Sequence, residues 1–120
     1  MKNYEIVAAY DALTSFYNTA TDLPIKVAYN LAMNRKTLEP FYITILHMKD
    51  DVIKQFGQEN DDGTYRIPDD KVADAQRELD KLSVIDNEVE LRKISIYDLP
   101  ETNIKPSELE AWMCMISEEE

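Results

Sequence analysis

The side chains that most often do chemistry are few in this chain and lie far apart along it. There is one cysteine, Cys114, and one histidine, His47. A thiol nucleophile needs a nearby base, and a zinc site needs cysteines or histidines at short spacings. Neither pattern occurs, and the only two glycines, Gly57 and Gly63, exclude a glycine-rich phosphate loop. The sequence therefore predicts a protein that is not an enzyme, with no catalytic residue, no metal ligand and no bound cofactor.

Carboxylates are the one abundant reactive group, and they are unevenly spread. The formal net charge is −11, yet residues 1–58 balance at six acids and six bases. Residues 59–90 hold eleven acids and four bases, a net charge of −7, and residues 101–120 hold six acids and one base, a net charge of −5. The run Asn60-Asp61-Asp62 lacks the alternating ligands and the closing glutamate of an EF-hand loop. These acids therefore indicate a charged surface and not a metal site.

An acidic surface repels nucleic acids and membrane surfaces and attracts basic protein surfaces. We therefore expect a protein partner with a basic surface, with solubility alone as the alternative role of the acids. The hypothetical partner-binding acids are Asp61, Asp62, Asp69, Asp70, Asp74, Glu78 and Asp80. A second hypothetical patch is Trp112, Met113 and Met115, because methionine and aromatic side chains adapt to other surfaces. The alternative for these three residues is that they close the domain core.

The element that must position these residues is one long predicted helix over residues 23–56. Asp22 is a suitable N-cap, Pro24 suits the first turn, and Gly57 suits a left-handed helix end. Its apolar track consists of Val27, Leu31, Leu38, Phe41, Ile45, Met48 and Val52. Asn34 is the one polar member, and we expect it at the edge of the track, in contact with water, with a buried residue that fixes helix register as the alternative. Pro40 predicts a kink, with a break into two helices as the alternative.

The remaining chain predicts three shorter helices and two strands within a single domain, residues 1–120. The helices span about residues 3–20, 69–84 and 106–117, and the strands span about residues 64–67 and 88–96. We expect the two strands to pair, and residues 58–60 to add a short polar edge before the Asp62-Gly63 turn. The predicted fold class is α+β, mostly α, with antiparallel helices around the kinked central helix and a small two- or three-stranded sheet.

The layout also resembles a family of small proteins of unknown function that bacteriophages and prophages of Gram-positive bacteria encode. The likeness rests on the segments 22–26, 52–57, 62–63, 88–96, 97–99 and 104–109, together with Tyr29, Leu31 and Asn34. It spans nearly the whole chain. The family brings no known catalytic residues, so it implies no site.

The resemblance and the acidity together give two competing functions, neither of them enzymatic. The first is a phage-type accessory protein that inhibits a host nucleic-acid-handling or defence system, as an anti-CRISPR protein does, through its acidic surface. The second is a virion assembly or packaging accessory, or a chaperone, that forms a homo-oligomer through its helices. No apolar run approaches membrane-spanning length and a lone cysteine fits a reducing compartment, so we expect the bacterial host cytoplasm.

Overall fold

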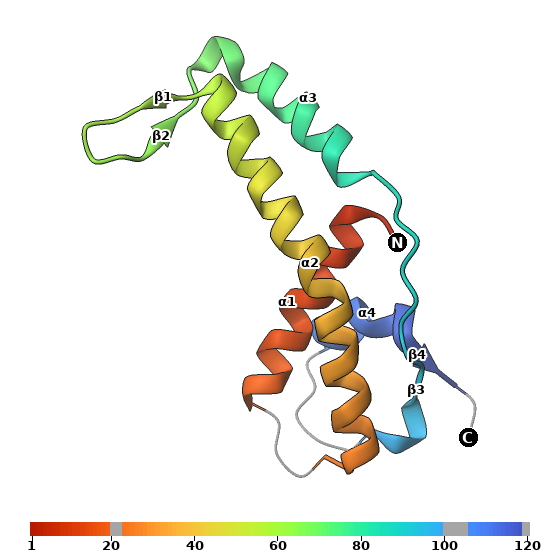
Figure 1. Ribbon diagram of the computed structural model, residues 1–120. Coiled ribbons are helices and arrows are strands. Elements are labelled where there is room, and N and C mark those ends of the chain that lie inside the picture. Colours follow the sequence, from red (N-terminus) through yellow and green to blue (C-terminus); the bar gives the residue numbers. More distant parts are fainter. Residues whose placement is uncertain (20–22, 100–105, 119–120) are drawn as a thin grey trace.

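The computed structural model describes residues 1–19, 23–99 and 106–118, and it confirms the predicted α+β, mostly α fold class. The α-helices are α1 (Asn3–Thr19), α2 (Ile25–Phe56), α3 (Val72–Ser83) and α4 (Pro106–Trp112). Short 3-10 helices are η1 (Asp69–Lys71), η2 (Ile96–Asp98) and η3 (Met113–Met115). The strands are β1 (Gln58–Glu59), β2 (Tyr65–Arg66), β3 (Ile94–Ser95) and β4 (Ile116–Ser117). Figure 1 shows α2 running through the whole molecule, with α1 and α4 around its first half and α3 beside its second half.

The core of the molecule forms where α1 packs against the first half of α2 and against α4. Apolar residues at helical spacing make one face of α1 hydrophobic, and they are buried: Ile6, Ala9, Tyr10, Leu13 and Phe16. Trp112 and Met115 are fully buried in the same cluster. The Trp112 ring meets Phe16 edge to face, with centroids 4.6 Å apart. We call this part of the molecule the body.

α2 is one uninterrupted helix of 32 residues, with Pro40 inside it. The chain therefore does not break at the proline. Figure 1 shows the axis changing direction near its middle, the region where Pro40 cannot donate a backbone hydrogen bond and crowds the preceding turn. Pro24 lies just before the helix, and its carbonyl accepts from the Ala28 N–H at 3.0 Å. The predicted N-cap, Asp22, lies outside the described residues.

The expectation that Gly57 ends α2 in a left-handed conformation is wrong. Its φ is −92° and its ψ is 164°, which is extended backbone. The glycine is needed for a different reason, because a Cβ at this position would lie 2.6 Å from the carbonyl oxygen of Ile53. That carbonyl accepts a hydrogen bond from the Gly57 N–H at 2.7 Å, so the backbone of the last helical turn packs directly against Gly57.

The predicted pairing of the two strands is also wrong. β2 pairs with β1 in a local antiparallel hairpin, whereas β3 pairs with β4 in parallel. The predicted strand over residues 88–96 is reduced to Ile94–Ser95. Val89 and Leu91 are partly buried against the core while Glu88 and Glu90 are exposed. The alternating sequence therefore reflects packing of an extended segment on the body and not a ladder of paired strands.

The last helix is shorter than the predicted 106–117. It ends at Trp112, continues as η3, and becomes extended at Ile116. Parallel pairing of Ile116 with Ile94 requires extended backbone, so the chain leaves the helical conformation there. This difference places Met115 in the core between the end of α4 and the first half of α2.

Asn34 is not at a water-facing edge as expected, because only 1% of its surface is exposed. A buried amide in an apolar track needs hydrogen-bond partners. The partners of the Asn34 amide are the backbone N–H and the backbone carbonyl of Arg92.

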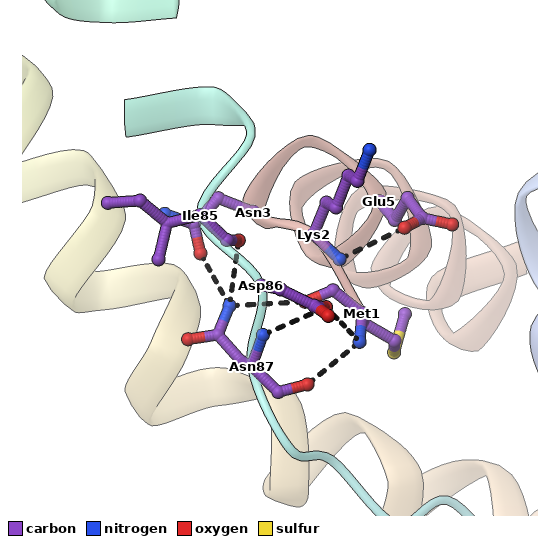
Figure 2. A network of polar contacts seen from close by, with 7 residues as sticks. All are labelled: Met1, Lys2, Asn3, Glu5, Ile85, Asp86 and Asn87. Atoms are coloured by element: carbon purple, nitrogen blue, oxygen red, sulfur yellow. Dashed lines mark hydrogen bonds and ion pairs between the residues drawn. The ribbon is translucent and has the colours of Figure 1, made fainter. Parts of the chain in front are cut away.

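The segment after α3 is fastened to the first residues of the chain by a polar network (Figure 2). The Met1 amine donates to the Asn87 carbonyl at 2.8 Å, and the Asn87 amide donates to the side-chain oxygen of Asn3 at 2.7 Å. Asn3 in turn donates to the carbonyl of Leu82 at 2.7 Å, and its N–H donates to the carbonyl of Ile85 at 3.0 Å. Asn3 is buried, so these bonds hold the end of α3 against the start of α1.

Candidate functional site

The second half of α2 and α3 form a two-helix arm that extends beyond the body, and the β1–β2 hairpin and η1 lie at its far end (Figure 1). The arm makes the molecule elongated, with extents of 53 × 30 × 23 Å and a radius of gyration of 17.5 Å. A compact domain of this length has a radius of gyration of about 14 Å. The arm therefore projects from the compact part of the fold.

The tip of the β1–β2 hairpin is fixed by a small set of polar contacts. Gly63 has a positive φ of 86°, which confirms the predicted turn after Asp62. The Asp62 carboxylate accepts from the Thr64 hydroxyl at 2.6 Å and from the Thr64 N–H at 3.1 Å. The hydrogen bond from the Thr64 hydroxyl is the largest cause that lowers the pKa of the Asp62 carboxyl, and the one from the Thr64 N–H lowers it further. The turn therefore holds Asp62 ionised and exposed beside Asp61.

Acids are densest at this far end of the arm. Residues 59–71, from β1 to the end of η1, contain five acids and two bases, a net charge of −3. The five are exposed, and we call them the distal acids: Glu59, Asp61, Asp62, Asp69 and Asp70. None of them forms an ion pair with another residue in the described part of the chain. The negative charge here is therefore open to an external cation.

The structure separates the seven predicted acids into two groups. Asp61, Asp62, Asp69 and Asp70 belong to the distal acids, whereas the other three lie along α3. There, Asp74 pairs with Arg77 at 3.4 Å, and Glu78 pairs with Lys81 at 3.1 Å. Asp80 accepts from the Gln76 amide at 2.8 Å. With three acids and two bases, α3 carries a net charge of only −1, so it contributes little to the field of the arm.

Glu59 is a distal acid that the sequence analysis missed. It lies on β1, opposite Tyr65 on β2. The signal that points to it is the Asp62-Gly63 turn, because a hairpin brings the residues before and after such a turn together. Asn60 reinforces this arrangement, since its N–H donates to the Thr64 carbonyl at 2.7 Å.

The second predicted patch is divided between the core and the surface. Trp112 and Met115 are 0% exposed, so in this structure neither side chain is available to a partner. Met113 is 66% exposed and borders a groove of about 520 Å³ between α1 and α4, next to Tyr4. The Trp112 Nε1–H has no hydrogen-bond partner among the described residues. Only Met113 therefore remains as a candidate contact.

The two residues with nucleophile or base character are separated in the structure. His47 is exposed on the arm, whereas Cys114 is half-buried in η3 beside α1. Burial, as the largest cause, raises the pKa of the Cys114 thiol, which disfavours the reactive thiolate. Within the described residues, no group of three or more histidines, cysteines or carboxylates is placed to hold a metal ion.

Comparisons with protein-family models, with curated proteins and with solved structures gave no match for this chain. The resemblance to small phage proteins is therefore still a prediction. Among the described helices, none combines the length and the apolar character that crossing a membrane requires.

Proposed function

We propose that this chain is a non-enzymatic accessory protein that binds the basic surface of another protein through the distal acids. The observation that carries the proposal is their placement: five exposed carboxylates and only two bases lie at the end of a projecting arm. A surface carboxylate that pairs with a neighbouring base contributes little to the electric field at a distance. The i, i+3 ion pairs of α3 are of this kind. The distal acids lack such neutralisation within the described chain.

The arm geometry suits electrostatic capture. The field of exposed charges decays over about 8 Å at physiological ionic strength, so only charges that approach a partner closely contribute. A narrow arm brings its tip to a recessed basic surface that a rounded body does not reach. Basic grooves of this kind bind the phosphate backbone in nucleic-acid-handling proteins. Together with the resemblance to phage proteins, this favours inhibition of a host defence system in the cytoplasm, in the manner of an anti-CRISPR protein.

The test is capture from a host lysate at low and high salt with three immobilised baits. The first is the wild-type chain, and the second carries D61N, D62N, D69N and D70N. The third, a matched control, carries D74N, E78Q and D80N on α3. We expect the wild type and the control to enrich one nucleic-acid-binding protein, and we expect the four-site variant and high salt to abolish that capture. Equal capture by the four-site variant would overturn the proposal.

A second function, virion assembly through helix-mediated oligomerisation, is favoured by one observation on the arm. Ile43 and Leu46 on α2 are 44% and 41% exposed, although both are large apolar side chains. Self-association that buries them would form a defined oligomer. Sedimentation of the wild-type chain and of an I43Q/L46Q variant tests this, because the assembly role requires an oligomer that the variant loses.

A further inference from the structure

The groove of about 520 Å³ lies on the body, between one face of α1 and the chain from α4 to η3. Its volume falls within the range of about 300–1,000 Å³ that is usual for ligand pockets. Small side chains, Ala8 of α1 and Ala111 of α4, line it and leave room between the two helices. Because α1 and α4 pack against each other, both walls are held by the body and not by the arm.

Two carboxylates line this groove, and no base among the described residues does so. They belong to Glu5 of α1 and Glu110 of α4, and both residues are exposed. Neither forms an ion pair within the described part of the chain. The Glu5 carboxylate accepts a hydrogen bond from the backbone N–H of Lys2 at 2.9 Å, which Figure 2 shows and which fixes its position. The groove therefore carries two negative charges that the described residues do not pair.

The elements that form the two walls are themselves acidic. α1 contains two acids and no base, and residues 106–115, from α4 to the end of η3, also contain two acids and no base. Two bases come near: Lys2 precedes α1, and the Lys93 ammonium donates to the carbonyl of Cys114 at 2.7 Å. With both counted, four acids and two bases leave a net charge of −2. The field of the walls therefore attracts a cation into the groove.

Two exposed side chains in the lining select the kind of cation. Tyr4 is 55% exposed and Met113 is 66% exposed. A tyrosine ring attracts a cation over its face, and a methionine side chain adapts to the shape of an apolar stem. An arginine side chain combines these needs, because its planar guanidinium pairs with carboxylates and stacks on aromatic rings. The lysine ammonium is a compact and strongly hydrated charge that stacks less well.

We propose that the groove between α1 and α4 binds an arginine side chain of a basic partner protein. The guanidinium pairs with Glu5 and Glu110, while its stem and its plane contact Met113 and Tyr4. This inference rests on the proposed function, since it adds a second contact to the same partner. The distal acids attract an extended basic surface at the end of the arm, whereas the groove on the body holds one particular residue.

The probe is a short peptide with one arginine and blocked ends, titrated into the ¹⁵N-labelled full chain and followed by amide chemical shifts. The same peptide with citrulline, which has the shape of arginine without its charge, and with lysine serves as the comparison. The test variant is E5Q/E110Q. Its matched control is E88Q/E90Q, which changes the net charge equally at exposed acids outside the groove lining.

A second pair of variants tests the aromatic wall without changing any charge. Y4A removes the ring that lines the groove, and Y97A removes a ring that is 63% exposed elsewhere on the body. Both positions are exposed, so neither variant opens the core. The amide spectrum of each variant shows directly whether the fold is retained.

We expect the arginine peptide to shift the amides of the groove lining, with equal affinity for the wild type, E88Q/E90Q and Y97A. The affinity should fall about tenfold in E5Q/E110Q, which loses the charged hydrogen bonds, and about threefold in Y4A. The citrulline peptide should not bind, and the lysine peptide should bind more weakly than the arginine peptide.

Unchanged affinity in E5Q/E110Q, or equal binding of the citrulline or lysine peptide, would overturn the groove proposal. A dimer of the chain alone that Y4A dissociates would also overturn it, because a second copy would then be the occupant. Shifts confined to residues 59–71 would overturn it as well, yet they would support the role of the distal acids. Failure here is therefore distinct from failure of the proposed function, which depends on the four-site variant.

Discussion

Asn34 in the first half of α2 exchanges two hydrogen bonds with the backbone of Arg92, which lies 58 residues later in the chain. Its side-chain oxygen accepts the Arg92 N–H at 2.7 Å, and its amide donates to the Arg92 carbonyl at 3.0 Å. The same amide lies 3.3 Å from the sulfur of Met115. One helical side chain thus supplies the donor and acceptor that a neighbouring strand would supply, and it fixes where the extended segment crosses α2.

Replacing Asn34 with alanine should destabilise the fold. The Arg92 N–H and carbonyl would lose their partners in a partly buried place, at a cost of roughly 1–3 kcal/mol. Chemical denaturation of N34A measures the change in the free energy of unfolding. N30A is the matched control, because Asn30 accepts only a long 3.5 Å contact from the exposed Arg92 side chain. An N34A protein as stable as N30A would contradict a structural role for the Asn34–Arg92 pair.

The two glycines should respond differently to substitution. G57A places a Cβ against the Ile53 carbonyl, so we expect a loss of more than about 1 kcal/mol and a frayed end of α2. At Gly63 a Cβ meets open space but the φ is 86°, so G63A should cost about 1 kcal/mol and G63N less. Thermal unfolding of the three variants checks this order. A G57A protein with unchanged stability would rule out the close contact.

Replacing Pro40 with alanine should stabilise α2. The alanine N–H restores a hydrogen bond to the Lys36 carbonyl and removes the ring clash, which together are worth up to about 3 kcal/mol in a helix interior. Circular dichroism should show a higher melting temperature with no loss of helix, and the exposed T37A on the preceding turn serves as the control. A lower melting temperature would mean that the bend is required to seat α3 against α2.

The hairpin tip should be sensitive to acid. The pKa of Asp62 is lowered in the folded state relative to about 3.9 in an unfolded chain. Its contribution is therefore fully present above the unfolded pKa and is lost as the pH falls through the folded pKa. Carboxyl NMR titration should find the Asp62 pKa below its ordinary value, rising in T64V and restored in T64S. A pKa that is the same in T64V as in the wild type would show that the Thr64 hydroxyl is not the cause.

Helix positions were predictable from the sequence because apolar periodicity reports which face is buried. The track through Val27, Leu31, Leu38 and Ile45 is buried as that pattern requires, whereas Met48, a later member of the same predicted track, is 46% exposed. Strand pairing was not predictable in the same way, since it depends on contacts distant in the sequence. The Ile94–Ile116 pair and the Asn34–Arg92 bonds carry no local signal. A local turn signal was enough only for the β1–β2 hairpin.

The sequence predicted which residues could form the candidate site, but it did not predict which of them lie together or are paired with bases. The sequence shows where acids are dense, yet it does not show that Arg77 and Lys81 pair with Asp74 and Glu78 on α3. It also places Met113 and Met115 together, although one side chain is exposed and the other is buried. Residues two positions apart do not share a face of a helix, so the two side chains point in different directions along η3.

Because α2 belongs to both the body and the arm, one continuous helix has two neighbourhoods of different local stability. Its buried residues run from Val27 to Ile45, and its far end lies beside α3 in Figure 1. Amide hydrogen exchange should therefore be slow along residues 31–45 and several-fold faster along residues 46–56. The end of the helix can open transiently while the body stays folded. Binding of a partner to the arm would then slow amide hydrogen exchange only along residues 46–56 of α2.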